Sequence, residues 1–459
     1  MKSPTPRFPL ERALPQQVVK FECAFEAEDP RLRVLILVDC YYPSTKSSAK
    51  MVHDLAVELH RQRHQAIVLT PSETISSKVR TTTEDGVLVV RVKSGQIKGV
   101  NKVQRALNEA RLSGNLWRRT QDFLRKTPCD LILFYSPTIF FGALVRRLKQ
   151  LWKCPAYLIL RDIFPEWAVD AGVLRKGVVY NFFHSAAVEQ YEAADVIAVQ
   201  SPANRRYFSH EFPQRESSLK VLFNWMALNE MHLPRTTYRA RLGLESKIVF
   251  LYGGNIGVAQ DMDNLIRLAT RLASRSDIYF LLVGDGSEVR RLKKFIEVNR
   301  LCNIQILPSI AQSEYLSMVS EFDLGLISLD ARLKSHNYPG KLLSYLYWGK
   351  PVLASVNRGN DLLELLRDSG AGYCFVNGDD ENLISAALRL TDDSRLRVKM
   401  GRNARLLLEQ TFSVEHAVNQ IFDHLYEAQL IARGDRGKQS VLSDSRIQST
   451  ELADRSDAF

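Results

Sequence analysis

Residues 248–257 of this 459-residue chain read Ile-Val-Phe-Leu-Tyr-Gly-Gly-Asn-Ile-Gly, an apolar run that ends in glycines. A continuous apolar run of this length is typical of a parallel strand that is buried on both faces. Glycines directly after such a strand favour a tight turn, because they adopt backbone conformations that other residues avoid. The stretch therefore predicts a strand–turn–helix unit of an α/β fold, with the helix beginning near Asp261.

The same alternation of short apolar runs and amphipathic stretches recurs along most of the chain. Further strand candidates lie at 34–38, 66–70, 87–92, 131–134, 156–160 and 196–200, and then at 278–284, 304–307, 324–329, 351–355 and 372–376. The stretches between them are long enough for crossover helices. The polar segment 235–246 separates two such series, which predicts two doubly wound, Rossmann-like domains.

These patterns divide the chain into four parts. We expect an N-terminal extension at 1–30, a first domain at 31–235, a second domain at 236–432 and a tail at 433–459. A helical pattern ends the second domain. The tail is polar and is expected to be disordered.

Composition and charge narrow the class of protein. Hydrophobic residues make up 45% and charged residues 25%, which is ordinary for a globular protein. The net charge is +11, and residues 1–230 hold 33 Lys and Arg against 23 Asp and Glu. A basic half favours an anionic partner such as membrane lipid, a phosphorylated substrate or nucleic acid, although no known nucleic-acid motif is present.

Cysteines and apolar runs exclude further classes. None of the six cysteines forms a C-x-x-C pair, so neither a zinc site nor a redox dithiol is indicated. The N-terminus lacks a signal-peptide core, and no run reaches the roughly 18 apolar residues of a membrane span. We therefore expect a soluble or peripheral protein without a zinc site or a redox dithiol, and its single cysteines suit a reducing compartment such as the cytoplasm.

Glycines after the strand at 248–253 can bring backbone amides close to a phosphate. The candidate residues are Gly253, Gly254, Asn255 and Gly257, which precede a helix whose N-terminus offers free N–H groups and a positive dipole end. Neither the dinucleotide pattern G-x-G-x-x-G nor a P-loop is present. A tight turn without a ligand therefore remains an alternative.

Gly284, Asp285 and Gly286 end the next strand. Ligands of doubly wound folds bind at the carboxyl ends of strands, so these residues predict a position beside a nucleoside in the same cleft. Asp285 could instead cap the helix expected at 287–299.

Pro339, Gly340 and Lys341 suit the first turn of a helix over 341–348. A lysine there would add to the attraction of the helix N-terminus for a diphosphate. A solvated surface lysine is the alternative.

The segment Arg161-Asp162-Ile163-Phe164-Pro165-Glu166-Trp167 follows an apolar strand of the first domain. Charged residues directly after such a strand are expected to cap a helix or to face the cleft between the domains. Arg161, Asp162 and Glu166 are therefore candidates for a site.

The order and residues of these motifs resemble those of the family 4 glycosyltransferases over about residues 31–430. Among them they are similar to bacterial members for surface polysaccharides, such as O-antigen and capsule, that transfer N-acetylfucosamine. The resemblance rests on LILRDIFPEWAVDAGVL (158–174), QSPANRRYF (200–208), FNWMALNE (223–230), FLYGGNIGVAQDMDNLI (250–266), FLLVGDGSE (280–288) and YPGKLLSYLYWGKPVLAS (338–355).

This resemblance implies a GT-B fold, in which the two domains face each other across a cleft and the last helix crosses back onto the first domain. It implies a retaining transferase that requires no metal or other cofactor and that moves a sugar from a nucleotide-sugar, by family UDP-linked, in polysaccharide synthesis. The second domain would hold the donor through the glycines and Lys341, with Asn360 and Asp361 near the sugar. Asp162 would lie near the reaction centre.

Two departures from the family pattern keep other functions open. His336 and Ser344 stand where many members carry two glutamates, and Lys46-Ser47-Ser48-Ala49 replaces a glycine pair after the first strand. Ser344 could still bind a ribose hydroxyl. The alternatives are a non-catalytic subunit that binds nucleotide-sugar and an epimerase of the same fold.

Two segments of the first domain mix aromatic residues with cations. Residues 112–126 and 140–153 each contain four Lys or Arg, together with Trp117 and Phe123 in the first and Phe140, Phe141 and Trp152 in the second. Such segments suit an anionic membrane interface, which predicts an enzyme that docks peripherally at the inner face of the plasma membrane and acts on a polyprenyl-diphosphate-linked sugar. They equally suit helices that pack on the sheet and expose their charges.

Overall fold

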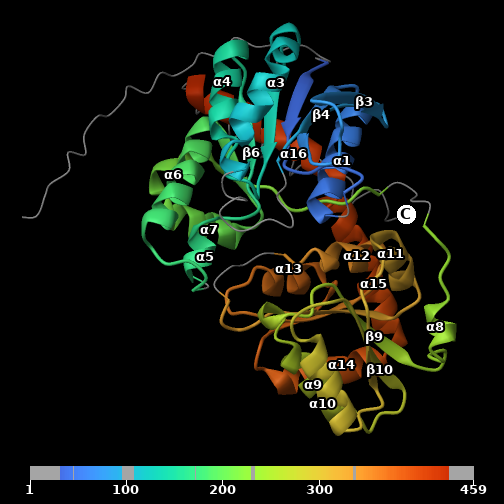
Figure 1. The fold of residues 1–459 in the computed structure, drawn as a ribbon. Coiled ribbons are helices and arrows are strands. Elements are labelled where there is room, and N and C mark those ends of the chain that lie inside the picture. The colour runs from blue at the N-terminus through green and yellow to red at the C-terminus, as the bar shows by residue number, and fades with distance from the viewer. Residues whose placement is uncertain are drawn as a thin grey trace, which may run out of the picture.

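The computed structural model describes residues 31–44, 46–95, 108–170, 172–228, 233–333 and 338–433. Figure 1 shows two α/β domains, one above the other, each with helices around a central sheet. The expected extension at 1–30, almost all of the expected tail at 433–459, and His336 lie outside the described residues.

The first sheet contains the six predicted strands of the first domain and two more. Its order is β3-β4-β2-β1-β5-β6-β7-β8, and all neighbours are parallel except β3 and β4. The strands are β1 (Arg33–Leu37), β2 (Gln65–Ser72), β3 (Val79–Glu84), β4 (Val87–Lys93), β5 (Leu131–Tyr135), β6 (Ala156–Ile159), β7 (Val196–Val199) and β8 (Leu219–Val221). Its helices are α1 (Ser47–Arg61), α3 (Leu112–Lys126), α4 (Gly142–Trp152), α5 (Glu166–Asp170), α6 (Val178–Ala193) and α7 (Pro202–Glu211).

The antiparallel β3–β4 hairpin was not predicted. Asp85 and Gly86 form its turn with φ angles of 48° and 79°. Positive φ at both central residues is typical of the two-residue turns whose twist matches that of paired strands. Because β3 is polar and partly exposed, it lacks the apolar run that revealed the other strands.

The second sheet consists of the six strands predicted for the second domain. Its order is β11-β10-β9-β12-β13-β14, and every pair is parallel. The strands are β9 (Ile248–Gly253), β10 (Ile278–Val283), β11 (Ile304–Leu307), β12 (Leu324–Ser328), β13 (Val352–Val356) and β14 (Gly372–Val376). The helices are α8 (Tyr238–Arg241), α9 (Met262–Arg271), α10 (Val289–Val298), α11 (Gln312–Ser320), α12 (Lys341–Tyr347), α13 (Leu362–Ser369), α14 (Asp380–Asp392), α15 (Ser394–Thr411) and α16 (Val414–Arg433).

Both sheets are buried on two faces, as their continuous apolar strands predict. In β1, Leu35 and Leu37 join one core cluster, whereas Val34 and Ile36 join the cluster on the opposite face. Burying large side chains on both faces supplies most of the driving force for each domain. The prediction of two doubly wound domains is confirmed.

The helical pattern at 395–432 corresponds to two helices, α15 and α16. The chain crosses back to the first domain at the break between them. Met226 donates its backbone N–H to Phe412 O over 2.8 Å and accepts from Val414 N over 3.0 Å. Beyond this point α16 packs on the first domain, with Val418 and Ile421 in the same core cluster as Val34. Figure 1 shows α16 among the elements of the first domain, between β6 and α1. The predicted crossing of the last helix is confirmed.

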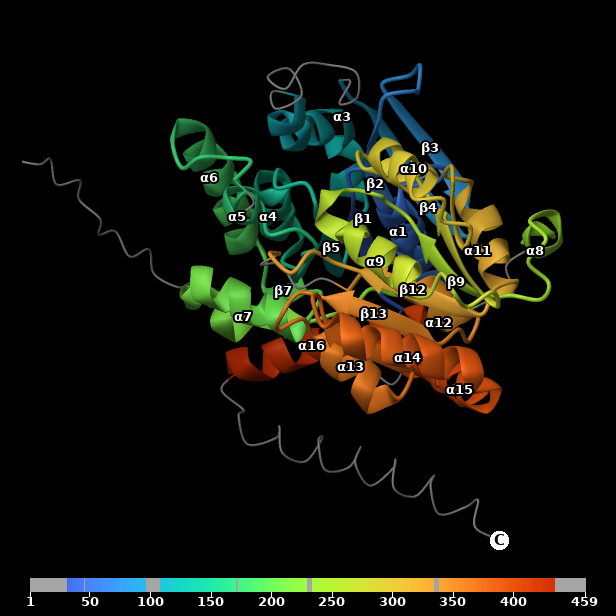
Figure 2. The same ribbon diagram turned by 90° about the horizontal axis from the view of Figure 1, so that it is seen from below.

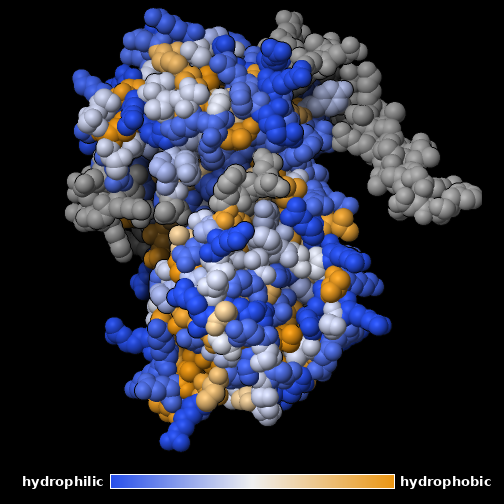
Figure 3. Space-filling view, turned by 90° about the vertical axis from the view of Figure 1, so that its right-hand side faces the viewer, coloured by the Kyte–Doolittle hydropathy of each residue, from blue (hydrophilic) through white to orange (hydrophobic). Residues whose placement is uncertain are grey.

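Seen from the side that carries α8, the molecule is mostly hydrophilic, with hydrophobic residues in scattered small groups (Figure 3). Scattered exposed apolar residues are normal for a globular protein. Among the described residues, no helix is long and apolar enough to cross a membrane.

Candidate functional site

The loops after β9 and β10 pack backbone against backbone. Gly254 N donates to Val283 O and Ile256 N donates to Asp285 O, both over 2.9 Å. A Cβ on Gly284 would lie 1.8 Å from Gly254 O, and one on Gly286 would lie 2.1 Å from Ile256 O. The glycines of the second loop are therefore needed for this close approach.

Lys341, the first residue of α12, lies directly against Gly254. A Cβ on Gly254 would be 3.5 Å from Lys341 Cε and 3.9 Å from Nζ, and Nζ lies 3.8 Å from the centre of the Tyr252 ring. Gly254 is exposed and has a φ of 115°, so a ligand could approach its Cα beside the lysine. The structure thus brings together the amide loop and the cation that the sequence predicts as one phosphate site.

Burial lowers the pKa of Lys341 to about 7. Among the described residues, no carboxylate forms an ion pair with its ammonium group, and the Tyr252 ring offers only a cation–π contact. A half-buried amine without a counter-ion is a position where an anionic ligand gains most. The electrostatics of this position therefore favour a phosphate.

The buried Tyr345 and the partly buried Tyr315 hold this loop, and the sequence analysis did not single them out. Tyr345 donates its hydroxyl hydrogen to backbone carbonyls of β9 and β12, 3.0 Å from Leu251 O and 3.1 Å from Leu326 O, and accepts from Gly253 N over 3.3 Å. A Cβ on Gly253 would lie 2.0 Å from Tyr315 Oη. Tyr345 is four residues after Lys341 on α12, a spacing that places both on one face of the helix.

The other predicted donor-side residues are distributed around this point. Asn255 donates from Nδ2 to Gln260 Oε1 over 2.8 Å, and Gly257 lies against that amide. Asp285 accepts a hydrogen bond from Ser309 and does not cap α10, whose N-cap is Glu288. On α12, Gly340 is the exposed N-cap, and Pro339 and Ser344 are half-buried.

Arg161 departs from the expectation that it faces the cleft. Its side chain is buried, and its guanidinium donates to Leu222 O over 2.6 Å and to Phe223 O over 3.2 Å. The guanidinium also stacks over the Trp225 ring at 5.2 Å. Arg161 therefore ties β6 to the segment that leads into the second domain, and its role here is structural.

Glu166 likewise has a structural partner. It is buried near the start of α5, and its Oε1 lies 2.8 Å from His184 Nδ1 on α6. This contact fastens α5 to α6.

Asp162 has a carboxylate neighbour that the sequence analysis missed. Burial raises the pKa of Asp162, the charge of Asp39 raises it further, and Arg161 opposes the shift. Asp39 follows β1 and pairs with Lys46 at 3.6 Å, just before α1. Because β1, β5 and β6 are neighbours, Asp39 and Asp162 share the carboxyl edge of the first sheet. Asp39 could have been noticed, since it follows its strand as Asp162 does.

Asn360 and Asp361 serve the contact between the domains. Asp361 accepts from Ala203 N over 2.7 Å and from Arg206 Nη2 over 3.2 Å, which places its carboxylate at the N-terminus of α7. Asn360 is buried and bonds to Asn357 and to Leu362 N. Their predicted contact with a sugar would require these bonds to open.

This contact fixes how the two sheets face each other. The helix α7 starts after the carboxyl end of β7, and α13 starts after the carboxyl end of β13. Because the N-termini of these two helices meet at Asp361, the carboxyl edges of both sheets face the same gap. That is where parallel α/β sheets bind ligands.

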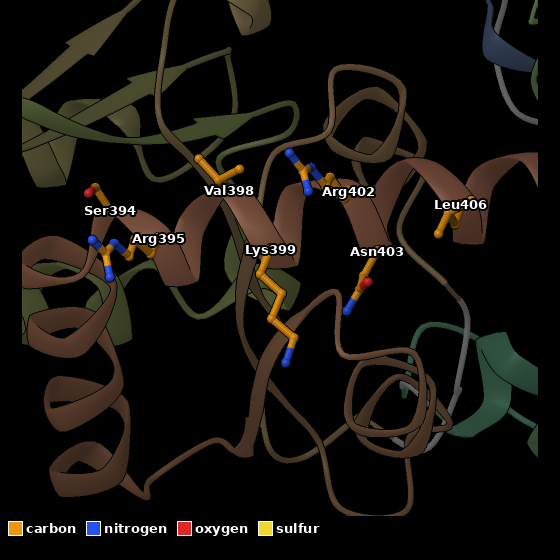
Figure 4. Close-up of a pocket in the computed structure, with 7 residues that line it drawn as sticks. All are labelled: Ser394, Arg395, Val398, Lys399, Arg402, Asn403 and Leu406. Carbon is orange, nitrogen blue, oxygen red and sulfur yellow. The ribbon is translucent and has the colours of Figure 1, made fainter. Parts of the chain in front are cut away.

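A shallow, open groove of about 510 Å³ runs along α15 (Figure 4). Its lining residues all come from that one helix and are Ser394, Arg395, Val398, Lys399, Arg402, Asn403 and Leu406. None of the predicted donor-binding residues lines this groove.

Both halves of the chain match glycosyltransferase models. Residues 48–224 match the glycosyl transferase 4-like domain, and residues 234–407 match the glycosyl transferases group 1 domain. The chain belongs to the family 4 glycosyltransferases. The prediction of a glycosyltransferase with the GT-B fold is confirmed, and the two matched segments correspond to the two sheets.

Among curated relatives of this glycosyltransferase is the probable glycosyltransferase WbjE of Pseudomonas aeruginosa. It is 24% identical over 261 residues, which cover 56% of this chain and 64% of that protein. The putative colanic acid biosynthesis glycosyl transferase WcaI of Escherichia coli K12 is 23% identical over 309 residues, which cover 66% of this chain and 75% of that protein. The chain thus spans about two thirds to three quarters of these relatives.

Among solved structures, HepE of Anabaena in complex with UDP is similar in fold. The TM-score is 0.61 at 18% identity, and the match covers 86% of this chain and all of that chain.

Proposed function

We propose that this glycosyltransferase moves a sugar from a UDP-linked donor to a polyprenyl-diphosphate-linked saccharide in bacterial surface polysaccharide synthesis, at the cytoplasmic face of the plasma membrane. The main observation in support of nucleotide-sugar binding is the contact of Gly254 with Lys341. The similar fold of HepE, whose structure contains UDP, supports the choice of nucleotide.

The chemistry of donor cleavage explains why such a site is needed. Breaking the anomeric C–O bond moves negative charge onto the departing diphosphate. Lys341 and the N-terminus of α12, which lie beside the exposed Gly254, could stabilise that charge without a metal ion. A lysine that is poised between its charged and neutral forms becomes fully charged when the diphosphate binds.

The proposed acceptor site lies at the carboxyl edge of the first sheet, which faces the second domain. We propose that Asp162 and Asp39 position the acceptor hydroxyl, while Lys46 offers a cation beside them. In a retaining reaction the leaving phosphate can itself take the acceptor's proton, so neither carboxylate has to act as a strong base. The basic charge of the first half of the chain suits an acceptor that carries a diphosphate.

The test is a transfer assay with the full chain. A panel of UDP-hexoses and UDP-N-acetylaminosugars is incubated with polyprenyl-diphosphate-linked acceptors, and products are identified by mass spectrometry. We expect one sugar to be added, with the donor's anomeric configuration kept in the NMR spectrum. Donor epimerisation, or donor binding without transfer to any acceptor, would contradict the proposal and favour the epimerase or the non-catalytic subunit.

A further inference from the structure

The turn between α5 and α6 and the start of α6 carry the most exposed large apolar side chains of the described residues. Val178 is 87% exposed and Val173 is 75% exposed. Trp167, Val179 and Phe182 are exposed beside them in the chain. We call these five residues the apolar tip. Soluble proteins rarely gather apolar side chains on the surface in this way without a partner.

The tip is held in place by the fold. Val173 N and Leu174 N both donate to Ala168 O over 2.9 Å. Below the tip, the Phe164 ring packs against Phe183 at 5.1 Å. The Glu166–His184 contact joins the same two helices. These contacts hold Val173, Leu174 and the start of α6 against α5.

The charges next to Val173 and Val178 are positive, although Asp170 stands in the chain between Trp167 and Val173. Residues 172–182 contain Arg175 and Lys176, both exposed, and no Asp or Glu. Exposed valines and aromatics flanked by cations are the combination that binds anionic lipid, since the apolar groups enter the headgroup region and the cations attract its charge. An acidic or purely apolar protein partner would explain only one of these two features.

The position of the tip fits the proposed acceptor. Because α6 connects parallel strands β6 and β7, its first residues lie at the carboxyl edge of the sheet, where Asp162 lies. Figures 1 and 2 show α6 at the outer border of the first domain. A bilayer that touched the tip would therefore border the gap between the domains.

We propose that the apolar tip docks the enzyme on an anionic lipid bilayer and so brings the gap between the domains to the membrane-bound acceptor. This inference rests on the proposed lipid-linked acceptor and names the surface that meets the lipid. The tryptophans of the segments at 112–126 and 140–153 do not form this lipid-binding surface. Trp117 lies under Arg147 at 4.9 Å, and Trp152 donates from Nε1 to Leu124 O over 3.1 Å, so both are used where α3 packs on α4.

The groove along α15 is the competing surface. It presents exposed Val398 and Leu406 with Arg395, Lys399 and Arg402. It lies on the opposite side of the molecule from α6 in both ribbon views, so one flat bilayer cannot touch both (Figures 1 and 2). Its apolar residues are less exposed than Val173 and Val178, and it is remote from the acceptor edge.

The experiment is flotation of the full chain with vesicles of phosphatidylcholine alone or mixed with phosphatidylglycerol. We expect the wild type to float with the anionic vesicles. The Val173→Asp/Val178→Asp variant should lower the bound fraction on the order of tenfold or more, and Arg175→Glu/Lys176→Glu should do so most strongly at low salt. Val398→Asp is the matched control and should float like the wild type. These side chains are exposed, so the variants should fold, which UDP binding verifies.

Three results would overturn the docking proposal. One is a wild type that binds UDP but floats with neither vesicle, which leaves the donor site intact. Another is loss of flotation in Val398→Asp with none in Val173→Asp/Val178→Asp, which assigns docking to α15. The third is self-association in sedimentation, abolished by Val178→Asp, without vesicle binding; the tip would then join two copies of the chain. Failure to bind UDP would instead contradict the proposed function.

Discussion

The donor-side loops and the segment after β6 were predicted on similar grounds, yet the structure uses them differently. In the second domain, Gly254 and Lys341 adjoin each other, and the lysine lacks a counter-ion among the described residues. In the first domain, Arg161 and Glu166 are buried in contacts with the protein itself. The comparison teaches that an exposed backbone and an unpaired cation identify a site better than charge next to a strand does.

The largest effect is expected where two loops depend on a missing side chain. Gly284→Ala would place a Cβ 1.8 Å from Gly254 O. Because backbone must move, we expect unfolding to become easier by about 3 kcal/mol or more, with loss of UDP binding. Thermal melting and calorimetric titration measure both.

Gly114→Ala is the matched control for that variant. Gly114 lies inside α3 with nothing near its Cα that a methyl would meet. Alanine there should be neutral or stabilise by roughly 0.5–1 kcal/mol. If Gly284→Ala melts and binds UDP as the wild type does, the close packing of the two loops is not needed.

Arg161→Met tests the first-domain part of the comparison, because it should lower stability without changing donor binding. It leaves two backbone carbonyls without their donor in a buried place, so the free energy of unfolding should fall by about 2–4 kcal/mol. UDP affinity should stay within about twofold, because the residue contributes no group to the donor site. A stable variant that has lost transfer activity would restore Arg161 as a residue of the active site, as first expected.

Lys341→Met should have the reverse effect of Arg161→Met, with weaker donor binding and no loss of stability. Removing a charge-assisted contact should weaken UDP binding by about 10- to 100-fold. The free protein should melt at the same or a higher temperature, because a half-buried amine without a counter-ion is replaced by an apolar chain of similar length. A lower melting temperature with unchanged UDP affinity would make Lys341 a structural residue like Arg161.

A smaller effect is expected at the contact between the domains. Asp361→Asn removes the charge at the N-terminus of α7 and should weaken the contact by about 0.5–1 kcal/mol. Small-angle scattering should then report a larger radius of gyration. Asp368→Asn, whose carboxylate pairs with Arg367 at the surface, is the control and should change nothing. Equal scattering from both variants would show that Asp361 does not hold the domains together.

Most of the fold and part of the site could be predicted from the sequence. Apolar strands and glycine turns are local signals, so the sequence predicted β9 with its observed bounds. It also predicted that the loop after β9 and Lys341 belong to one site, and the structure places them side by side. The partners of Arg161 lie 61 and 62 residues along the chain, and those of Asp361 more than 150 residues away. Such contacts depend on how the domains pack, and no local pattern reports them.

The apolar tip shows a signal that was present but not used. The run Val178–Phe183 is apolar enough to suggest a buried helix, yet its first residues are exposed because α6 projects beyond the sheet at that end. Conversely, the aromatic residues of 112–126 and 140–153 looked available and are packed between helices.

The most direct test of the account is the pH dependence of UDP-hexose binding, because the diphosphate of such a donor does not titrate near neutral pH. Lys341 has a pKa of about 7 in the free protein and is charged below it. Wild-type affinity should therefore fall by roughly tenfold as the pH rises from about 6 to about 8.5, whereas Lys341→Met should bind weakly and without this slope. A flat wild-type profile, or the same slope in Lys341→Met, would contradict a diphosphate site built on Gly254 and Lys341.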